Sequence, residues 1–188
     1  MNHLVGSVSW NSNGWAAKPT DDDMRRSGHA NVREGYAGNE CLNFSKEPAT
    51  ITGGWKFGAV EKFEQKGRFT NGGLVFLWSR NPRADAPQIV GVLAQVERLE
   101  AYSQGWTTSA GRLEFNLRLP AIGGLALRFE PPVTVDAERH LRDGDQQKQG
   151  PGQACGCYID DASGRRILED AAAGGDARAL AIARLYGW

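Results

Sequence analysis

The sequence has no long hydrophobic run and few cysteines, and these two absences narrow the class of protein. No apolar stretch approaches the roughly 20 residues that a membrane-spanning helix needs, and no basic segment followed by an apolar run opens the chain. We therefore expect a soluble protein that is not exported and has no membrane partner. Three cysteines are an odd number and argue against a disulfide framework. The expected location is a reducing compartment, the cytoplasm.

The chain also lacks an imbalance of charge, with 22 Lys and Arg against 22 Asp and Glu. Residues 1–83 hold 11 basic and 8 acidic side chains, so the local excess of positive charge is small. Non-specific binding to duplex nucleic acid usually needs a concentrated basic face. The charge pattern argues against a wide nucleic-acid surface and permits a small one.

Motifs for the common catalytic chemistries are missing as well. The chain has no Gly-x-Ser-x-Gly element and no P-loop, and Cys155 and Cys157 are too close for a zinc knuckle. We expect no cofactor, no metal and no catalytic residue. Two enzymatic alternatives stay open: a nuclease with Mg²⁺ at Asp21–Asp23, and a small hydrolase that uses Cys41 and His29. A capped helix start accounts for the aspartates more simply.

What the sequence does contain is tryptophan, several times beside Ser, Asn or Gly. The six residues are Trp10, Trp15, Trp55, Trp78, Trp106 and Trp188. Indole faces can stack on a planar ligand while neighbouring Ser and Asn side chains hydrogen-bond its edge. The alternative, equally open on composition, is that these rings pack the ends of a small barrel.

Hydrophobic patterns predict the elements of the first third. Leu4 begins a strand that runs into a polar loop at Trp10, and Thr20 caps a short helix through Arg26. Residues 29–45 have no clean period and are expected to form an ordered loop. Residues 55–65 place aromatic and aliphatic side chains at helical spacing and predict an amphipathic helix.

The strongest prediction is a buried hairpin of Leu74–Trp78 and Ile89–Val96, rich in β-branched and aromatic residues. Trp78, Ser79 and Asn81 lie where its first strand leaves the core. A flat apolar ring beside hydrogen-bonding groups at a sheet end is a suitable mouth for a ligand pocket.

The remaining elements follow from alternation and capping. Leu113–Leu119 and Leu125–Phe129 alternate apolar with polar residues and predict a second hairpin, and Thr134 is expected to cap a helix ending at Leu141. Residues 142–156 are Gly- and Gln-rich and predict a mobile loop. The tail, 167–188, predicts two short helices.

The order of these motifs resembles the EVE branch of the PUA-like superfamily, to which YTH domains are related. The resemblance rests on Thr20–Arg26, Asn31–Arg33, Gly73–Asn81 followed by Ile89–Val92, and Pro132–Val135. It implies an α+β fold, a PUA-like twisted β-barrel flanked by short helices. The domain would span residues 1–145, with 146–188 as a mobile loop and a helical extension packed on it.

The resemblance also implies a function: binding of a modified base, methylated or hydroxymethylated, that is flipped out of DNA into a tryptophan-lined pocket. Such modules often give specificity to modification-dependent restriction systems of bacteria, so modified DNA is preferred to RNA as the partner, with a nuclease fused or separate. The predicted base-binding residues are Ser9, Trp10, Asn11, Asn13, Trp15, Trp55, Trp78, Ser79, Asn81 and Trp106, and the predicted phosphate-binding residues are Arg33, Arg80 and Arg83. An RNA-binding module, a metal-dependent nuclease or hydrolase, and a protein-interaction module are the alternatives.

Overall fold

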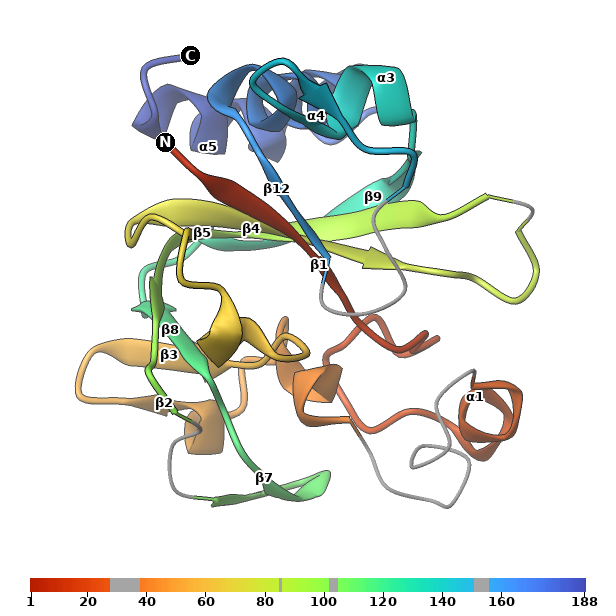
Figure 1. The fold of residues 1–188 in the computed structure, drawn as a ribbon. Helices are drawn as coiled ribbons and strands as arrows, with labels where there is room; N and C mark the ends of the chain where they lie inside the picture. Colours follow the sequence, from red (N-terminus) through yellow and green to blue (C-terminus); the bar gives the residue numbers. More distant parts are fainter. Residues whose placement is uncertain (28–37, 85, 102–104, 151–155) are drawn as a thin grey trace.

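The computed structural model describes the chain except for residues 28–37, 85, 102–104 and 151–155. It is an α+β protein with one large mixed sheet and few helices, which confirms the predicted class (Figure 1). The strands are β1 His3–Ser7, β2 Ile51–Thr52, β3 Trp55–Gly58, β4 Gly73–Ser79, β5 Gln88–Arg98, β6 Trp106–Thr108, β7 Gly111–Leu113, β8 Leu117–Pro120, β9 Ala126–Thr134, β10 Arg142–Asp143, β11 Gln146–Gln147 and β12 Cys157–Ile159. The helices are α1 Asp21–Arg26, α3 Ala137–His140, α4 Asp161–Ala173 and α5 Arg178–Leu185, with short 3-10 turns η1 Asn39–Leu42, η2 Pro48–Thr50 and η3 Phe63–Gln65.

The central hairpin is present as predicted. β4 and β5 pair antiparallel, and every residue of β4 is buried. The sheet runs in the order β12-β1-β4-β5-β8-β3-β2, and β9 also pairs with β5. β1 lies parallel to β4, with Ser7 opposite Trp78. Because parallel strands end at the same edge of a sheet, the segments that follow β1 and β4 leave the core side by side.

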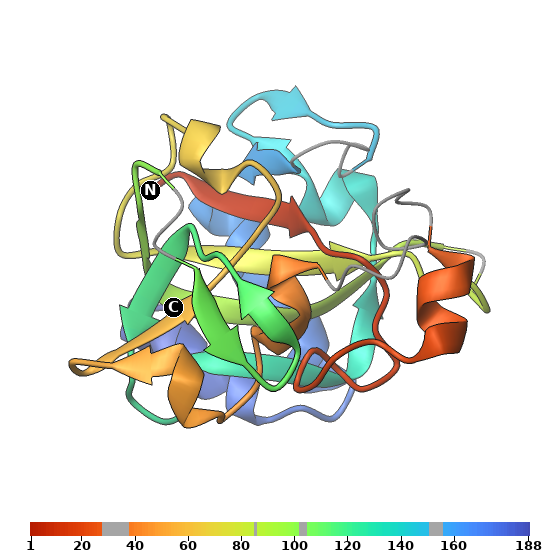
Figure 2. The ribbon, with the colours of Figure 1, turned by 90° about the horizontal axis from the view of Figure 1, so that it is seen from below.

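β5 joins the two halves of the sheet because it changes partner along its length. Gln88 to Leu93 pair with β9, and Glu97 and Arg98 pair with β8. Between them Gln95 has φ 55°, in the left-handed region that favours glycine. Its N–H donates to the hydroxyl of Tyr186 at 2.8 Å, which helps to hold the bend. Seen from below, the half of the sheet that contains β2, β3 and β8 lies across β4 and β5 (Figure 2).

The C-terminal helices cover one face of the sheet. Figure 1 shows α3, α4 and α5 together on one side of β1, β4, β5 and β9, with α1 on the other side. Ile167 and Ile182 are buried in the main core with Leu4 and Phe76. β12 pairs with β1, so the segment after residue 146 adds a strand to the sheet as well as two helices. No helix among the described residues is long and apolar enough to cross a membrane.

The predicted helix over 55–65 is wrong. Residues 55–58 form β3, which pairs with β8, and only Phe63–Gln65 is a 3-10 turn. Two buried asparagines hold the chain that follows β3. Asn43 exchanges hydrogen bonds with the backbone of Ala59, at 2.8 and 2.9 Å, and Asn116 does the same with Val60.

The predicted second hairpin is also wrong in its pairing. The alternating run breaks after Leu113, and the part from Leu117 pairs with β3 and β5. β9 pairs with β5 and continues through Pro131 to Thr134, so the two runs are not partners in the sheet. Alternation indicates which face of a strand is buried, but it does not identify the neighbouring strand.

Several element ends differ from those predicted. β1 ends at Ser7, before Trp10, and the helix expected after Thr134 is α3, capped by Asp136. Within residues 142–150 the predicted mobile loop contains the β10–β11 hairpin, while 151–155 lie outside the described residues. α4 begins six residues earlier than Ile167, at Asp161, where Asp160 caps it. The predicted acidic cap on α1 is confirmed, because Thr20 and Asp23 form a reciprocal capping box.

His3 is fully buried between the sheet and the C-terminal helices. Its Nδ1 accepts the N–H of Leu74 at 3.0 Å, and its Nε2 lies 2.9 Å from Asp161 Oδ1. The neutral ring with a proton on Nε2 satisfies both contacts. Burial lowers the pKa of His3 below its ordinary value of 6.5, and the attraction of Asp161 only partly opposes this.

Acid should therefore destabilise the fold through His3. The unfolded chain takes up a proton on His3 near pH 6.5 while the folded chain does not, so stability falls as pH drops below that value. The loss is at most about 1.4 kcal/mol for each pH unit. Urea unfolding at pH 7.5 and 5.5 should show a smaller acid loss for His3→Gln than for the wild type. Equal losses in the two proteins would exclude His3 as the titrating group.

Candidate functional site

The segments that leave β1 and β4 enclose a pocket at the edge of the sheet. Val8 N–H donates to Trp78 O at 3.0 Å, which keeps the two chain segments together beyond the paired residues. The pocket has a volume of ≈ 570 Å³, and residues from both strand ends, from α1 and from the chain after β3 line it. Four of the predicted base-binding residues meet here: Ser9, Trp10, Trp78 and Ser79.

Trp78 and Ser79, which line this pocket, each carry a buried polar side-chain atom. Trp78 is 8% exposed and Ser79 is 1% exposed. Within the part of the chain that the structure describes, neither Trp78 Nε1 nor Ser79 Oγ has a hydrogen-bond partner. A buried donor left unsatisfied costs about 1–3 kcal/mol, so native proteins rarely retain one without a functional or solvent partner. Two such atoms in one pocket indicate a place for a polar ligand.

Trp10 supplies an aromatic wall, and Trp15 supports it. The Trp10 ring is partly exposed and packs edge-to-face on Trp15, with centroids 5.8 Å apart. Trp15 is buried, and its Nε1 donates to Ser9 O at 2.9 Å. Trp15 therefore acts as a support within the loop, while Trp10 offers the accessible ring.

Asn11 and Asn13 are committed to the shape of the same loop. Asn11 is buried; its Oδ1 accepts Asn13 N–H at 2.9 Å and its Nδ2 donates to Ala17 O at 2.8 Å. Asn13 Nδ2 donates to Lys18 O at 2.7 Å. These side chains hold Trp10 in place, and neither residue lines the pocket at the ends of β1 and β4.

Asp23 fixes this loop to α1. Its Oδ2 accepts hydrogen bonds from the backbone and the hydroxyl of both Ser12 and Thr20, at 2.7–3.1 Å. Burial alone would raise the pKa of Asp23, but these bonds outweigh it and lower the pKa. Asp22 pairs with Arg26 at 2.9 Å. These contacts make Asp22 and Asp23 structural, and no cluster of metal-ligating side chains occurs among the described residues.

The predicted phosphate-binding residues lie on the rim. Arg80 is exposed and lines the pocket, together with Arg26 from α1. Arg83 and Asn81 line a neighbouring pocket of ≈ 370 Å³ that shares Trp10 with the first. Asn81 Oδ1 accepts Arg83 N–H at 2.9 Å and so shapes the turn. Arg33 lies outside the described residues, as does His29 of the hydrolase alternative.

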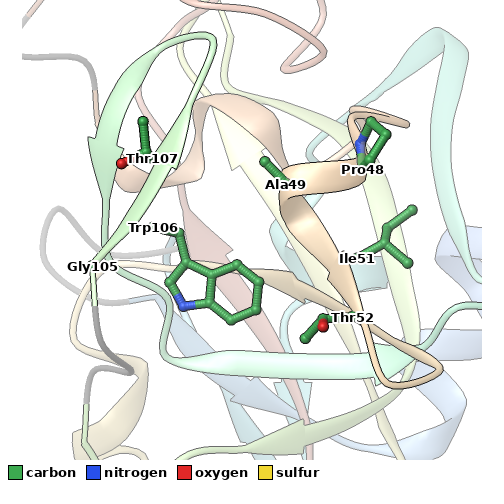
Figure 3. A pocket seen from close by; sticks show the side chains of 7 residues that line it. All are labelled: Pro48, Ala49, Ile51, Thr52, Gly105, Trp106 and Thr107. Atoms are coloured by element: carbon green, nitrogen blue, oxygen red, sulfur yellow. The ribbon is translucent and has the colours of Figure 1, made fainter.

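Trp106 and Trp55 lie in other parts of the molecule. Trp106 packs on Phe57, with centroids 4.7 Å apart, and points toward Ile51 and Thr52 across a groove of ≈ 600 Å³ (Figure 3). The guanidinium carbon of Arg118 lies 4.3 Å from the centre of the Trp55 ring, and Trp55 lines a further pocket. The structure therefore divides the predicted tryptophans among three places.

Glu61 was not identified from the sequence, yet it lines the pocket with Trp78 and Ser79. It lies within residues 55–65, for which the sequence predicts an amphipathic helix. In such a helix a charged residue between apolar ones is expected on the solvent-exposed face. No pattern in the sequence places it at the strand ends. Cys41, in contrast, is buried, and burial raises the pKa of its thiol to about 12, which leaves no thiolate for nucleophilic chemistry near neutral pH.

Comparisons with models of known protein families, with curated proteins and with solved structures found no match to this chain.

Proposed function

We propose that this chain is a non-catalytic reader that binds DNA through one modified base, held in the pocket at the ends of β1 and β4. The observation that carries the proposal is the pair of buried, unpartnered groups at Trp78 Nε1 and Ser79 Oγ. The indole N–H can only donate a hydrogen bond, whereas the hydroxyl can donate or accept. The edge of a nucleobase offers matching acceptors, and its face can lie on the indole of Trp10.

The energies are compatible with a flipped base. Taking a base out of the duplex costs a few kcal/mol, and stacking on an aromatic side chain returns about 1–3 kcal/mol. Hydrogen bonds to Trp78 Nε1 and Ser79 Oγ must supply the rest of the cost of flipping. The stacking and the edge contacts therefore have to act together. Arg80 and Arg26 line the pocket, and in this proposal they would bind the flanking phosphates, which carry no base information.

The proposal also includes a fold family, a type of nucleic acid and an associated nuclease. The PUA-like arrangement, the preference for DNA over RNA, and the association with a fused or separate nuclease come from the resemblance to EVE domains. A protein of this kind would act in the bacterial cytoplasm and mark modified DNA for cleavage. The size of this pocket and the balanced charge of the chain suit a small footprint on DNA.

Removing either orphaned group should weaken binding to modified DNA while sparing the fold. Trp78→Phe and Ser79→Ala should each reduce affinity about five- to tenfold, since a hydrogen bond contributes about 1 kcal/mol and about 1.4 kcal/mol is a factor of ten. Stability should not fall through a lost hydrogen bond, because these atoms have no partner in the described chain. The measurement is fluorescence anisotropy on duplexes carrying 5-methylcytosine, 5-hydroxymethylcytosine, N6-methyladenine or no modification, with RNA counterparts.

Trp55→Phe is the matched control, because Trp55 lines a different pocket. It should keep wild-type affinity for every duplex. If Trp78→Phe and Ser79→Ala are folded and retain the wild-type preference for modified DNA, the pocket at the ends of β1 and β4 is not the binding site. Cleavage of DNA by the wild type with Mg²⁺, lost in Asp22→Ala, would instead favour the nuclease alternative.

A further inference from the structure

Glu61 is carried to the pocket by a rigid segment. The chain that follows β3 is held by bidentate hydrogen bonds, from Asn43 to Ala59 and from Asn116 to Val60. Both asparagines are at most 1% exposed. The backbone that leads into Glu61 is therefore held firmly in place.

Val60 fixes the position of this segment against β1. A Cβ atom added to Gly6 would lie 2.4 Å from Val60 Cγ1, so the valine occupies the space that a side chain on β1 would fill. This close approach brings the next residue, Glu61, beside the end of β1. Glu61 thus lines the same pocket as Trp78 and Ser79 of β4.

The carboxylate is half-buried and has no hydrogen bond or ion pair with any residue that the structure describes. Arg26 and Arg80 line the same pocket, but Arg26 is paired with Asp22. A carboxylate near neutral pH only accepts hydrogen bonds. The residues that line the pocket therefore include the indole N–H of Trp78, which only donates, the carboxylate of Glu61, which only accepts, and the hydroxyl of Ser79, which does both. The other polar groups include the guanidinium donors of Arg26 and Arg80 and the hydroxyls of Ser7, Ser9 and Ser27, so Glu61 is the one carboxylate among the described lining residues.

We propose that Glu61 makes this pocket selective for bases that carry an exocyclic amino group. The inference rests on the proposed function and adds the class of base. Cytosine and adenine place an amino donor next to a ring-nitrogen acceptor, which complements Glu61 together with Trp78. Thymine and uracil place a carbonyl oxygen where the amino group would be and an N–H where the ring acceptor would be, so the carboxylate would face an acceptor and the indole N–H would face a donor. A site with such a polar group rejects the unmatched ligand strongly.

The test uses two modified bases that differ only along this edge. 5-Hydroxymethylcytosine and 5-hydroxymethyluracil share the modification and differ in an amino group against a carbonyl and in a ring-nitrogen acceptor against a ring N–H. In otherwise identical duplexes the wild type should bind the cytosine form at least about tenfold more tightly, the discrimination expected of a specific base-edge contact. Glu61→Gln, whose amide both donates and accepts, should reduce this ratio to about twofold or less. Glu61→Ala should reduce it as well.

Glu100→Gln is the charge-matched control, because Glu100 is exposed and lines neither of the two pockets that Trp10 lines. It should keep the wild-type ratio. If the wild type prefers modified DNA through Trp78 and Ser79 but the ratio is unchanged in folded Glu61→Gln, Glu61 is not the selective group and the proposed function still stands. If the wild type binds no modified duplex better than the plain one, both the proposed function and the role of Glu61 are overturned.

Discussion

Replacing Asn116 with alanine should lower the free energy of unfolding by about 3 kcal/mol, because the variant leaves the Val60 N–H without a partner, at about 1–3 kcal/mol, and removes two further hydrogen bonds at about 1 kcal/mol each. Val60 O keeps the N–H of Phe63 as a donor. Asn116 is fully buried. Its Oδ1 accepts Val60 N–H at 3.1 Å, and its Nδ2 donates to Val60 O at 2.7 Å and to Glu64 Oε2 at 2.9 Å. Alanine cannot replace any of these bonds, and the space it leaves is too enclosed for the backbone to find others easily.

Urea unfolding monitored by tryptophan fluorescence measures this loss. Asn13→Ala is the matched control: Asn13 is exposed, its side chain donates one hydrogen bond to Lys18 O, and its loss should cost no more than about 1 kcal/mol. Asn116→Asp keeps the shape and the acceptor for Val60 N–H but turns a carboxylate oxygen toward Val60 O and Glu64 Oε2, so at pH 7 it should destabilise the protein at least as much as alanine. A loss below about 1 kcal/mol for Asn116→Ala would mean that water or a rearranged backbone replaces the side chain.

The parts of the fold that the sequence predicts are those specified by neighbouring residues. β4 and the Ile89–Ala94 part of β5 are nearly continuous apolar runs joined by one short polar link, so composition predicts their burial and their hairpin. The start of α1 is equally local, because Thr20 and the aspartates after it satisfy the first N–H groups of the helix. In both cases the information lies within a few residues of the element.

The errors arise where distant residues decide the conformation. Residues 55–65 have helical spacing, but Asn43 and Asn116 lie 16 and 56 residues from the backbone groups that they bind. The partner of β8 is likewise set by the bend of β5 at Gln95, not by the turn that follows β8. The local spacing of apolar and polar residues carries no information about such long-range contacts.

The residues of the candidate site also fall into those that nearby sequence predicts and those that depend on distant contacts. Trp10, Trp78 and Ser79 could be predicted together because both strand ends are visible in the sequence and parallel pairing brings them to one edge. The loop amides of Asn11 and Asn13 looked like ligand-binding groups because their structural partners, Ala17 O and Lys18 O, are backbone atoms that leave no trace in side-chain composition. Glu61 was missed because its position depends on the long-range contacts described above.

Raising the pH from 7 to 10 should stabilise the wild type relative to Lys56→Met by about 2–3 kcal/mol, at about 1.4 kcal/mol for each unit between the two pKa values. Lys56 is 7% exposed, and its Nζ donates to Ser45 O at 2.6 Å without an ion pair to any described carboxylate. Burial lowers the pKa of this amine from 10.5 to about 8. Between these values the unfolded chain holds the proton and the folded chain has released it, so rising pH favours folding.

Methionine has a similar length and never carries the charge, so the variant should lack this gain. At pH 7 it avoids the burial of an ammonium group but leaves Ser45 O without its donor, and the two effects oppose each other. The change in the stability difference between pH 7 and 10, measured by urea unfolding, is therefore the decisive quantity. Lys46→Met, which removes an exposed lysine, should show little change over the same range. A constant difference between wild type and Lys56→Met would mean that the buried amine keeps its proton throughout, with water or a rearranged carboxylate beside it.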